Sequence, residues 1–243
     1  MKRIRYLTIR FDARLDRHEL PAFRGAIAEA VGPGHPLFHN HDDREPGGFV
    51  YRYPAIQYKR MGRNALIVCV EEGVDEIHQL FGKSTWDVDL NGRAITLAVA
   101  DLRLNQYTLQ AWETMFPFQL TDWLALNGPN YDRYQTLTTE ADRLDLLERV
   151  LRGNILSMAK GLDWHIDREV RVRITALSPL RRQRYKGQLL SCFDAEFTTN
   201  VFLPDWIGLG KGVSIGFGVV KGMRKERKTQ ASTTPATAHD DEY

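Results

Sequence analysis

Apolar and polar positions alternate along much of this chain, and the period of the alternation divides its first half into strands and helices. Rough alternation over Arg3 to Phe11 predicts a strand. The spacing of Phe23, Ile27, Ala30 and Val31 predicts a helix over Pro21 to Val31, which Gly32-Pro33-Gly34 ends. Further along, the pattern predicts strands at Tyr51 to Met61 and Ala65 to Val70, a short helix at Gly73 to Phe81, and a hairpin at Asn91-Gly92 within Trp86 to Leu104. The order strand, helix, strand, strand, helix, strand indicates a ferredoxin-like unit.

The second half repeats this order less clearly. Phe116 to Trp123 is apolar and aromatic, and Thr139 with Asp142 three positions later predicts the start of a helix. Three strand-like stretches follow, at Val170 to Ile174, Leu189 to Phe193 and Val213 to Val220. We therefore predict an α+β fold of two tandem ferredoxin-like (βαββαβ) halves, residues 1–115 and 116–222, and a disordered tail over 223–243.

Composition narrows the class of protein. The 243 residues are 43% hydrophobic and 26% charged, which is typical of a globular chain, and the net charge of +2 is too small to indicate nucleic-acid binding by itself. Cys69 and Cys192 form no C-x-x-C pair, so we expect a reduced, cytoplasmic protein. The N-terminus lacks the apolar segment of a signal peptide and the longest apolar runs are strand-sized, so we expect no membrane association.

A glycine-rich stretch near the C-terminus, LPDWIGLGKGVSIGFGVVKG, is the most distinctive part of the sequence. Gly208, Gly210, Gly212, Gly216, Gly218 and Gly222 alternate there with Lys211, Trp206 and Phe217. Such a run either forms a hairpin turn or presents N–H groups and a lysine to phosphates. The spacing matches neither the Walker A loop nor the dinucleotide fingerprint, which favours a polyanionic chain over a mononucleotide.

Charge and histidines supply two more candidate sites. Seven basic residues lie between Arg168 and Lys186 against the single acidic Glu169, and we interpret this stretch either as a solvated strand or as a phosphate track. Within it, Arg181, Arg182, Arg184 and Lys186 surround Tyr185, an aromatic that can stack on a base. A loop contains His39, His41 and Asp43, which begin a metallo-hydrolase pattern, but Arg44 stands where its last histidine belongs.

Four stretches together resemble the CRISPR-associated endoribonucleases that cut precursor CRISPR RNA, members of the RAMP superfamily. They are HPLFHNHD, YRYPAIQYKR with ALIVCVEEGVDEI, LERVLRGNILSMAKGLDW, and the glycine-rich stretch, and they span most of residues 35–222. The HNH triplet at 39–41 is most similar to a subgroup in which paired loop histidines serve catalysis.

The resemblance implies a metal-independent reaction without a cofactor, in which the RNA's 2′-hydroxyl attacks the neighbouring phosphate. His39 and His41 would then be the acid and base, in an order the sequence leaves open. Lys59 or Lys211 would stabilise the charge of the transition state. Repeat RNA would be bound by Arg181, Arg182, Arg184, Lys186 and the glycine-rich residues Gly208, Gly210, Lys211, Gly212, Gly216 and Gly218.

The sequence leaves two other functions open. Some members of the superfamily are non-catalytic subunits that bind CRISPR RNA in an effector complex, and a metal-dependent hydrolase using His39, His41 and Asp43 is a further alternative. The partner expected in either RNA reading is CRISPR repeat RNA. Effector-complex subunits and a second copy of the chain are additional candidate partners.

Overall fold

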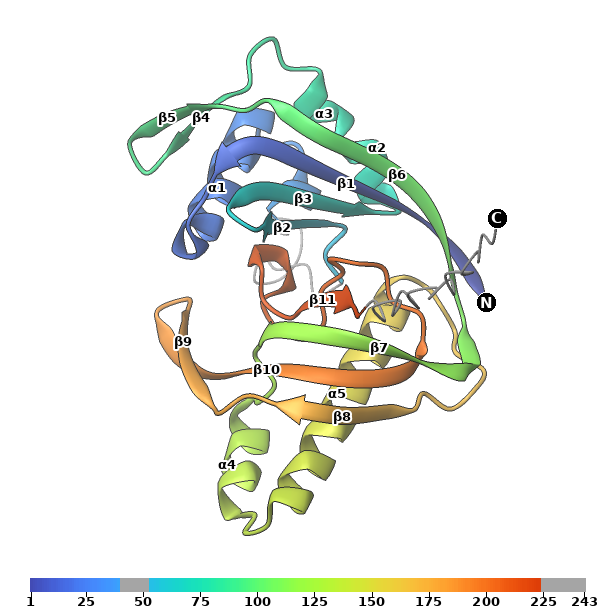
Figure 1. The fold of residues 1–243 in the computed structure, drawn as a ribbon. Coiled ribbons are helices and arrows are strands. Elements are labelled where there is room, and N and C mark those ends of the chain that lie inside the picture. The colour runs from blue at the N-terminus through green and yellow to red at the C-terminus, as the bar shows by residue number, and fades with distance from the viewer. Residues whose placement is uncertain (40–52, 224–243) are drawn as a thin grey trace, which may run out of the picture.

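The computed structural model describes residues 1–39 and 53–223, which form two sheet-rich halves packed on each other (Figure 1). In the first half, the antiparallel strands follow the order β2-β3-β1-β6, which is the strand order of a ferredoxin-like unit. Its strands are β1 (Lys2–Arg14), β2 (Ile56–Met61), β3 (Asn64–Val70) and β6 (Val99–Leu109), and a separate hairpin consists of β4 (Asp87–Leu90) and β5 (Arg93–Thr96). Its helices are η1 (Arg17–Glu19), α1 (Leu20–Val31), η2 (Pro36–Phe38), α2 (Glu72–Glu76) and α3 (His78–Phe81).

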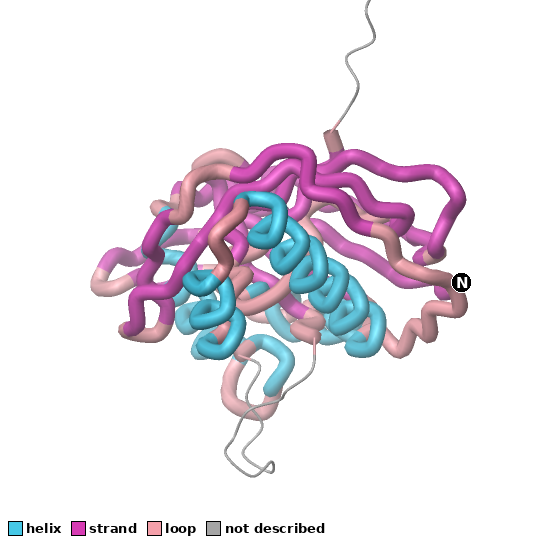
Figure 2. The backbone as a smooth tube through the Cα atoms, turned by 90° about the horizontal axis from the view of Figure 1, so that it is seen from below, coloured by secondary structure: helices cyan, strands magenta, loops and turns pink. Residues whose placement is uncertain are grey.

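The second half has the same strand order, β11-β7-β10-β8, with β9 paired to the outer part of β10. Its strands are β7 (Ala111–Trp123), β8 (Val172–Leu177), β9 (Arg181–Tyr185), β10 (Gln188–Val201) and β11 (Val219–Gly222). Its helices are α4 (Gly128–Thr136), α5 (Glu140–Gly161) and the short η3 (Val213–Ile215). Figure 2 shows α5 as the long helix that lies across the strands. The predicted tandem ferredoxin-like fold is confirmed.

Most elements predicted from the sequence are present. The hairpin at Asn91-Gly92 connects β4 and β5, and α5 begins where Thr139 was expected to cap it, with the Thr139 hydroxyl accepting from the Asp142 N–H at 3.1 Å. The short helix at 73–81 is divided into α2 and α3. The tail from Arg224 lies outside the described residues.

One predicted strand is wrong. Val213 to Val220 alternates in sequence, yet only β11 from Val219 is extended, and residues 213–215 form η3. Gly212, Gly216 and Gly218 have φ angles of +76°, +84° and +60°, which are incompatible with a continuous strand. The glycines therefore turn the chain in place of the second helix of the ferredoxin-like unit.

The first sheet packs on both of its faces. Leu7, Ile9 and Ile67 point to α1 and belong to the core of the first half. Ile4, Tyr6, Leu66, Val68 and Val70 point the other way and share one continuous core with β7, β10 and α5. The Tyr6 hydroxyl also donates to the Asp205 carbonyl at 2.8 Å. The two halves are thus joined by apolar packing.

Among the described residues, no helix is both long and apolar enough to cross a membrane.

Candidate active site between the two halves

The glycine-rich segment, residues 208–218, lies between the two halves (Figure 1). A Cβ atom added to Gly218 would lie 1.9 Å from the Leu209 carbonyl oxygen, and one added to Gly216 would lie 2.4 Å from a methyl of Leu20 in the first half. The Tyr53 hydroxyl donates to the Gly208 carbonyl at 2.8 Å. These close approaches explain why the segment needs glycine: its backbone fills the space between the halves.

Only part of the segment can present N–H groups to a ligand. The N–H groups of Gly208, Leu209, Ile215, Phe217 and Gly218 donate to partners within the protein. The exposed part of the segment is centred on Gly210 and Lys211. A phosphate would therefore meet the segment at this turn rather than along its whole length.

Arg24 connects the predicted histidine loop to the glycine-rich segment. From α1, its guanidinium group donates to the His39 carbonyl and, at 3.3 Å, to the Ser214 hydroxyl in η3. Burial lowers the pKa of the Arg24 guanidinium group from its ordinary value. His39 is half-buried at the end of η2, where the buried Phe38 carbonyl accepts from the Tyr58 hydroxyl at 2.9 Å. His39 is thereby fixed beside η3.

The second predicted catalytic histidine, His41, lies outside the described residues, and so does Asp43. The proposed acid and base pair, and the alternative metal pattern, therefore stay predictions. Among the described residues, no cluster of three or more His, Cys, Asp or Glu side chains has the arrangement of a metal site.

Lys59, one of two candidates for stabilising the transition state, is fully buried. Its Nζ lies 3.5 Å from the Val213 carbonyl oxygen, beneath η3, and burial lowers the pKa of its ammonium group to about 7. The other candidate, Lys211, is exposed, and its Nζ lies 5.2 Å from the centre of the Tyr185 ring. Of the two lysines, Lys211 is the one open to solvent.

The basic residues predicted to bind RNA lie on the β9–β10 hairpin in different environments. Arg181 is paired with Asp194 at 2.6 Å and with Asp122 at 3.4 Å. Arg182 donates to the Tyr131 hydroxyl at 2.8 Å, and Arg184 and Lys186 are exposed at the tip of the hairpin. Arg184 and Lys186 are therefore better placed than Arg181 to contact a phosphate.

The other basic residues of the stretch meet acidic residues from elsewhere in the sequence. Arg168 pairs with Glu113 at 2.8 Å, and Arg173 lies 3.7 Å from Glu148. The sequence shows only Glu169 within the stretch, but folding brings these carboxylates from β7 and α5. Within this stretch, Arg168 and Arg173 therefore have carboxylate partners, and Arg171 donates to the Glu113 carbonyl at 2.9 Å.

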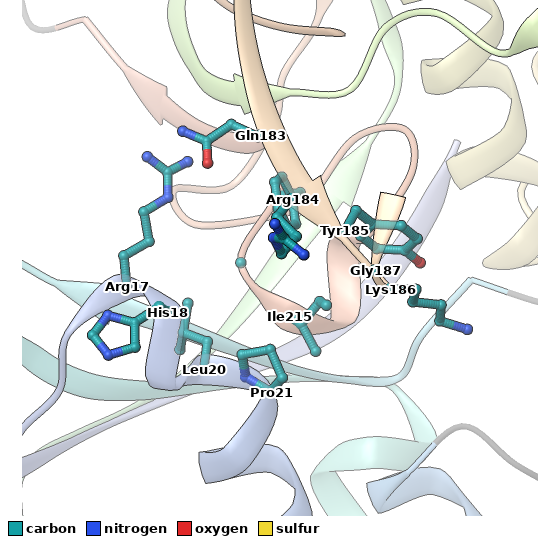
Figure 3. A pocket seen from close by; sticks show the side chains of 12 residues that line it. Arg17, His18, Leu20, Pro21, Gln183, Arg184, Tyr185, Lys186, Gly187 and Ile215 are labelled. Atoms are coloured by element: carbon teal, nitrogen blue, oxygen red, sulfur yellow. The ribbon is translucent and has the colours of Figure 1, made fainter. Parts of the chain in front are cut away.

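A cleft of about 410 Å³ lies where the two halves and the hairpin meet (Figure 3). Its walls come from three segments far apart in sequence: Arg17 and His18 of η1 with Leu20 and Pro21 of α1; residues 183–187 of the hairpin; and Ile215, Gly216 and Phe217. Tyr185 packs edge-on against Phe217, with ring centres 5.7 Å apart. The exposed basic residues of the hairpin and the glycine-rich segment therefore share one cavity.

Several residues of this region were missed by the sequence analysis. Arg24 stands within an apolar helix and looks there like a solvent-exposed residue. Arg17 pairs with Asp122, which holds the end of β7 against the first half. Asp122 has a positive φ of 56°, and its carbonyl accepts from the Gly218 N–H at 3.0 Å. These contacts join segments about a hundred residues apart, so no local pattern could have revealed them.

Comparison with known proteins finds similarity to one protein family along almost the whole chain. The family model of the Cas6b N-terminal domain matches residues 2–108, and that of the Cas6b C-terminal domain matches residues 110–223. An uncharacterized protein of Methanocaldococcus jannaschii is 36% identical over 109 residues, which are 44% of this chain and 73% of that protein.

Solved structures agree with the family models. A crystal structure of Cas6b is similar with a TM-score of 0.83 and 28% identity, over 91% of this chain and 100% of that one. A second, of the CRISPR RNA processing endoribonuclease Cas6b, has a TM-score of 0.70 and 26% identity over the same shares. The product of a Cas6-related gene from Pyrococcus furiosus, at 14% identity and a TM-score of 0.51, shares the fold. The resemblance inferred from the sequence is confirmed, and the chain belongs to the Cas6b family.

Proposed function

We propose that this protein is a metal-independent endoribonuclease that cleaves precursor CRISPR RNA within its repeats. The observation that carries the proposal is the double contact of Arg24, which donates to the His39 carbonyl and to the Ser214 hydroxyl. Through Arg24, the backbone of His39 is tied to η3 of the glycine-rich segment, and Ile215 of η3 lines a cleft with cationic residues. The similar Cas6b structure that is called a CRISPR RNA processing endoribonuclease supports the choice of substrate.

In the proposed reaction, the 2′-hydroxyl oxygen attacks the adjacent phosphorus and the bond from phosphorus to the 5′-oxygen breaks. A base takes the 2′-hydroxyl proton and an acid gives a proton to the leaving 5′-oxygen, so the upstream fragment ends in a 2′,3′-cyclic phosphate. Histidine suits both roles because its pKa lies near neutral pH, and each proton transfer contributes roughly 10²–10⁴ in rate. We assign His39 and His41 to this pair, and we propose that the exposed Lys211 stabilises the phosphorane charge.

The test is single-turnover cleavage of a labelled repeat RNA from the host's own CRISPR array, in excess EDTA. We expect the wild type to cut, and His39→Ala and His41→Ala each to lose at least about a hundredfold in rate. His165→Ala removes an exposed histidine from the loop after α5 and is the matched control. A 2′-deoxy nucleotide at the cleavage site should abolish cutting, because it removes the nucleophile.

Three results would overturn the proposal in different directions. Cutting of the 2′-deoxy RNA would rule out attack by the 2′-hydroxyl. Cutting that returns only when a metal is restored would favour a metal-dependent hydrolase. Tight binding without any cleavage would favour a non-catalytic subunit of an effector complex.

A further inference from the structure

The cleft between α1, the β9–β10 hairpin and η3 combines apolar walls with cationic side chains. The walls are apolar and aromatic, with Leu20, Pro21, Ile215 and the ring of Tyr185. The cleft is also lined by His18, Arg184, Lys186 and Arg17, of which Arg17 pairs with Asp122, and no carboxylate is among the described residues that line it. Apolar walls with cationic side chains suit a ligand that has a flat apolar part and an anionic part.

The size of the cleft sets an upper limit on this ligand. A volume of about 410 Å³ is at the small end of the range for ligand pockets, which run from about 300 to 1,000 Å³. The cleft can therefore enclose one base with its sugar, and the rest of a longer ligand would lie outside it. Single-stranded RNA presents unstacked bases that proteins bind by stacking on aromatic side chains, whereas duplex RNA does not.

The position of the cleft relates it to the histidine. Ile215, in its wall, follows Ser214, and Ser214 is tied through Arg24 to the His39 carbonyl. Figure 3 shows the Arg17 side chain extending towards Gln183, and Pro21 lying opposite the hairpin residues Arg184 and Tyr185. A nucleotide held between them would therefore lie close to the proposed cleavage site.

We propose that this cleft holds one unpaired nucleotide of the bound RNA, with its base against Tyr185 and Ile215 and its phosphate against Arg184. Gln183 stands at the cleft with an amide that can donate to and accept from a base edge, so it is the residue we assign to base selection. The inference rests on the proposed function for the identity of the RNA. It adds a site that is separate from the acid and base.

The test measures equilibrium binding of the host repeat RNA in which a single abasic nucleotide is moved along the sequence. We expect one position, near the cleavage site, at which loss of the base weakens binding by the wild type about tenfold, as for one stacked base. In Tyr185→Ala, loss of the same base should change binding less than twofold, because the wall of the pocket is already gone. Elsewhere, the abasic substitutions should affect both proteins equally.

Arg184→Ala provides a second variant, since Tyr185→Ala also removes the contact with Phe217 and could unfold the hairpin. Arg184 is exposed, so the variant should fold normally. If Arg184 contacts one phosphate of a single strand, the slope of log affinity against log salt should fall by about 0.7. Arg103→Ala, on the outer strand β6, removes the same charge and should leave the slope unchanged.

The two proposals fail in distinguishable ways. Equal losses at every abasic position in wild type and Tyr185→Ala, or an unchanged salt slope in Arg184→Ala, overturn the nucleotide site even if the RNA is cut. Coupling at one position without any cleavage supports the nucleotide site and overturns the endoribonuclease. Absence of RNA binding overturns both.

Discussion

The Nζ of Lys59 lies 3.5 Å from the carbonyl oxygen of Val213, fully buried beneath the glycine-rich segment. Burial lowers the pKa of this ammonium group to about 7, against a value of about 10.4 for lysine in an unfolded chain. Between these values the unfolded chain binds more protons than the folded protein, so raising the pH stabilises the fold. We expect the free energy of unfolding to rise by about 1.5 kcal/mol between pH 7 and 8.5 from this group alone.

Denaturant unfolding of wild type and Lys59→Met at both pH values isolates the effect of Lys59. Burial also raises the pKa of the Cys69 and Cys192 thiols, which favours the unfolded state as the pH passes about 8.5, but this contribution is present in both proteins. The gain of wild type over Lys59→Met should therefore remain. Parallel pH profiles of the two proteins would show that Lys59 keeps an ordinary pKa.

Gly218→Ala should destabilise the protein by at least about 2 kcal/mol. The backbone at Gly218 has a φ of +60°, and an added Cβ would lie 1.9 Å from the Leu209 carbonyl oxygen, which is backbone and cannot move away. The midpoint of chemical denaturation measures the loss.

Gly153→Ala is the matched control for this substitution. Gly153 lies inside α5, and among the described residues no atom outside the local helix backbone lies within 4 Å of an added Cβ. Alanine in the interior of a helix is favoured over glycine by roughly 0.5–1 kcal/mol, so this variant should be more stable than wild type. A destabilised Gly153→Ala would mean that the contact at Gly218 alone does not explain the difference.

Arg24→Ala should slow cleavage of repeat RNA by about 10- to 100-fold while its Kd changes less than about threefold. The reason is positional: without the guanidinium group, the His39 carbonyl and the Ser214 hydroxyl lose their common partner, and small displacements of a reacting group lower rates steeply. Single-turnover rates and binding are measured on the same RNA. Arg24→Lys can keep one of the two contacts, so it should recover part of the cleavage rate. If Arg24→Ala instead lost cleavage rate and RNA binding equally, Arg24 would be an RNA contact.

Asp122→Asn should lower the free energy of unfolding by about 1–3 kcal/mol, because the pairs with Arg17 and Arg181 lose their charge while their site stays partly buried. Asparagine tolerates the positive φ at this position, so the backbone is not strained. Asp75→Asn removes the exposed pair with Arg5 and should lower stability less than Asp122→Asn does, because water screens an exposed pair. Equal losses of stability in Asp122→Asn and Asp75→Asn would contradict the inference that partial burial makes the Asp122 pairs stronger.

Local signals in the sequence predicted the elements that depend on local chemistry. Thr139 with Asp142 begins α5, and Asn91-Gly92 turns β4 into β5, because capping and turn preferences act over a few residues. The helix α4 was missed: its Asn127 cap, with the side chain accepting from the Asn130 N–H at 2.9 Å, precedes a mostly polar segment that packs on the core only through Tyr131 and Tyr134 among its described residues. The strand at 213–218 was wrong because alternation alone does not take account of glycine φ angles.

The candidate site, too, could be predicted only in part from the sequence. Local composition revealed the glycine-rich segment and the basic hairpin, and the spacing of His39 and His41 indicated a pair of histidines. The sequence did not reveal the Arg24 contact that links the histidine loop to the glycine-rich segment, because Arg24 and Ser214 are 190 residues apart. Nor could the sequence reveal that Lys59 is buried, since its place in an alternating strand predicts an exposed side chain.

Because the two halves share one core, each half depends on the other for its stability. Ile4, Tyr6, Leu66, Val68 and Val70 are covered only because the second half is folded against them. A chain cut at Gln110 would expose this apolar strip in water, so neither piece is expected to be a stable protein alone. Unfolding should then be all-or-none, and a substitution that loosens the core of one half should also disturb the proposed RNA site between the halves.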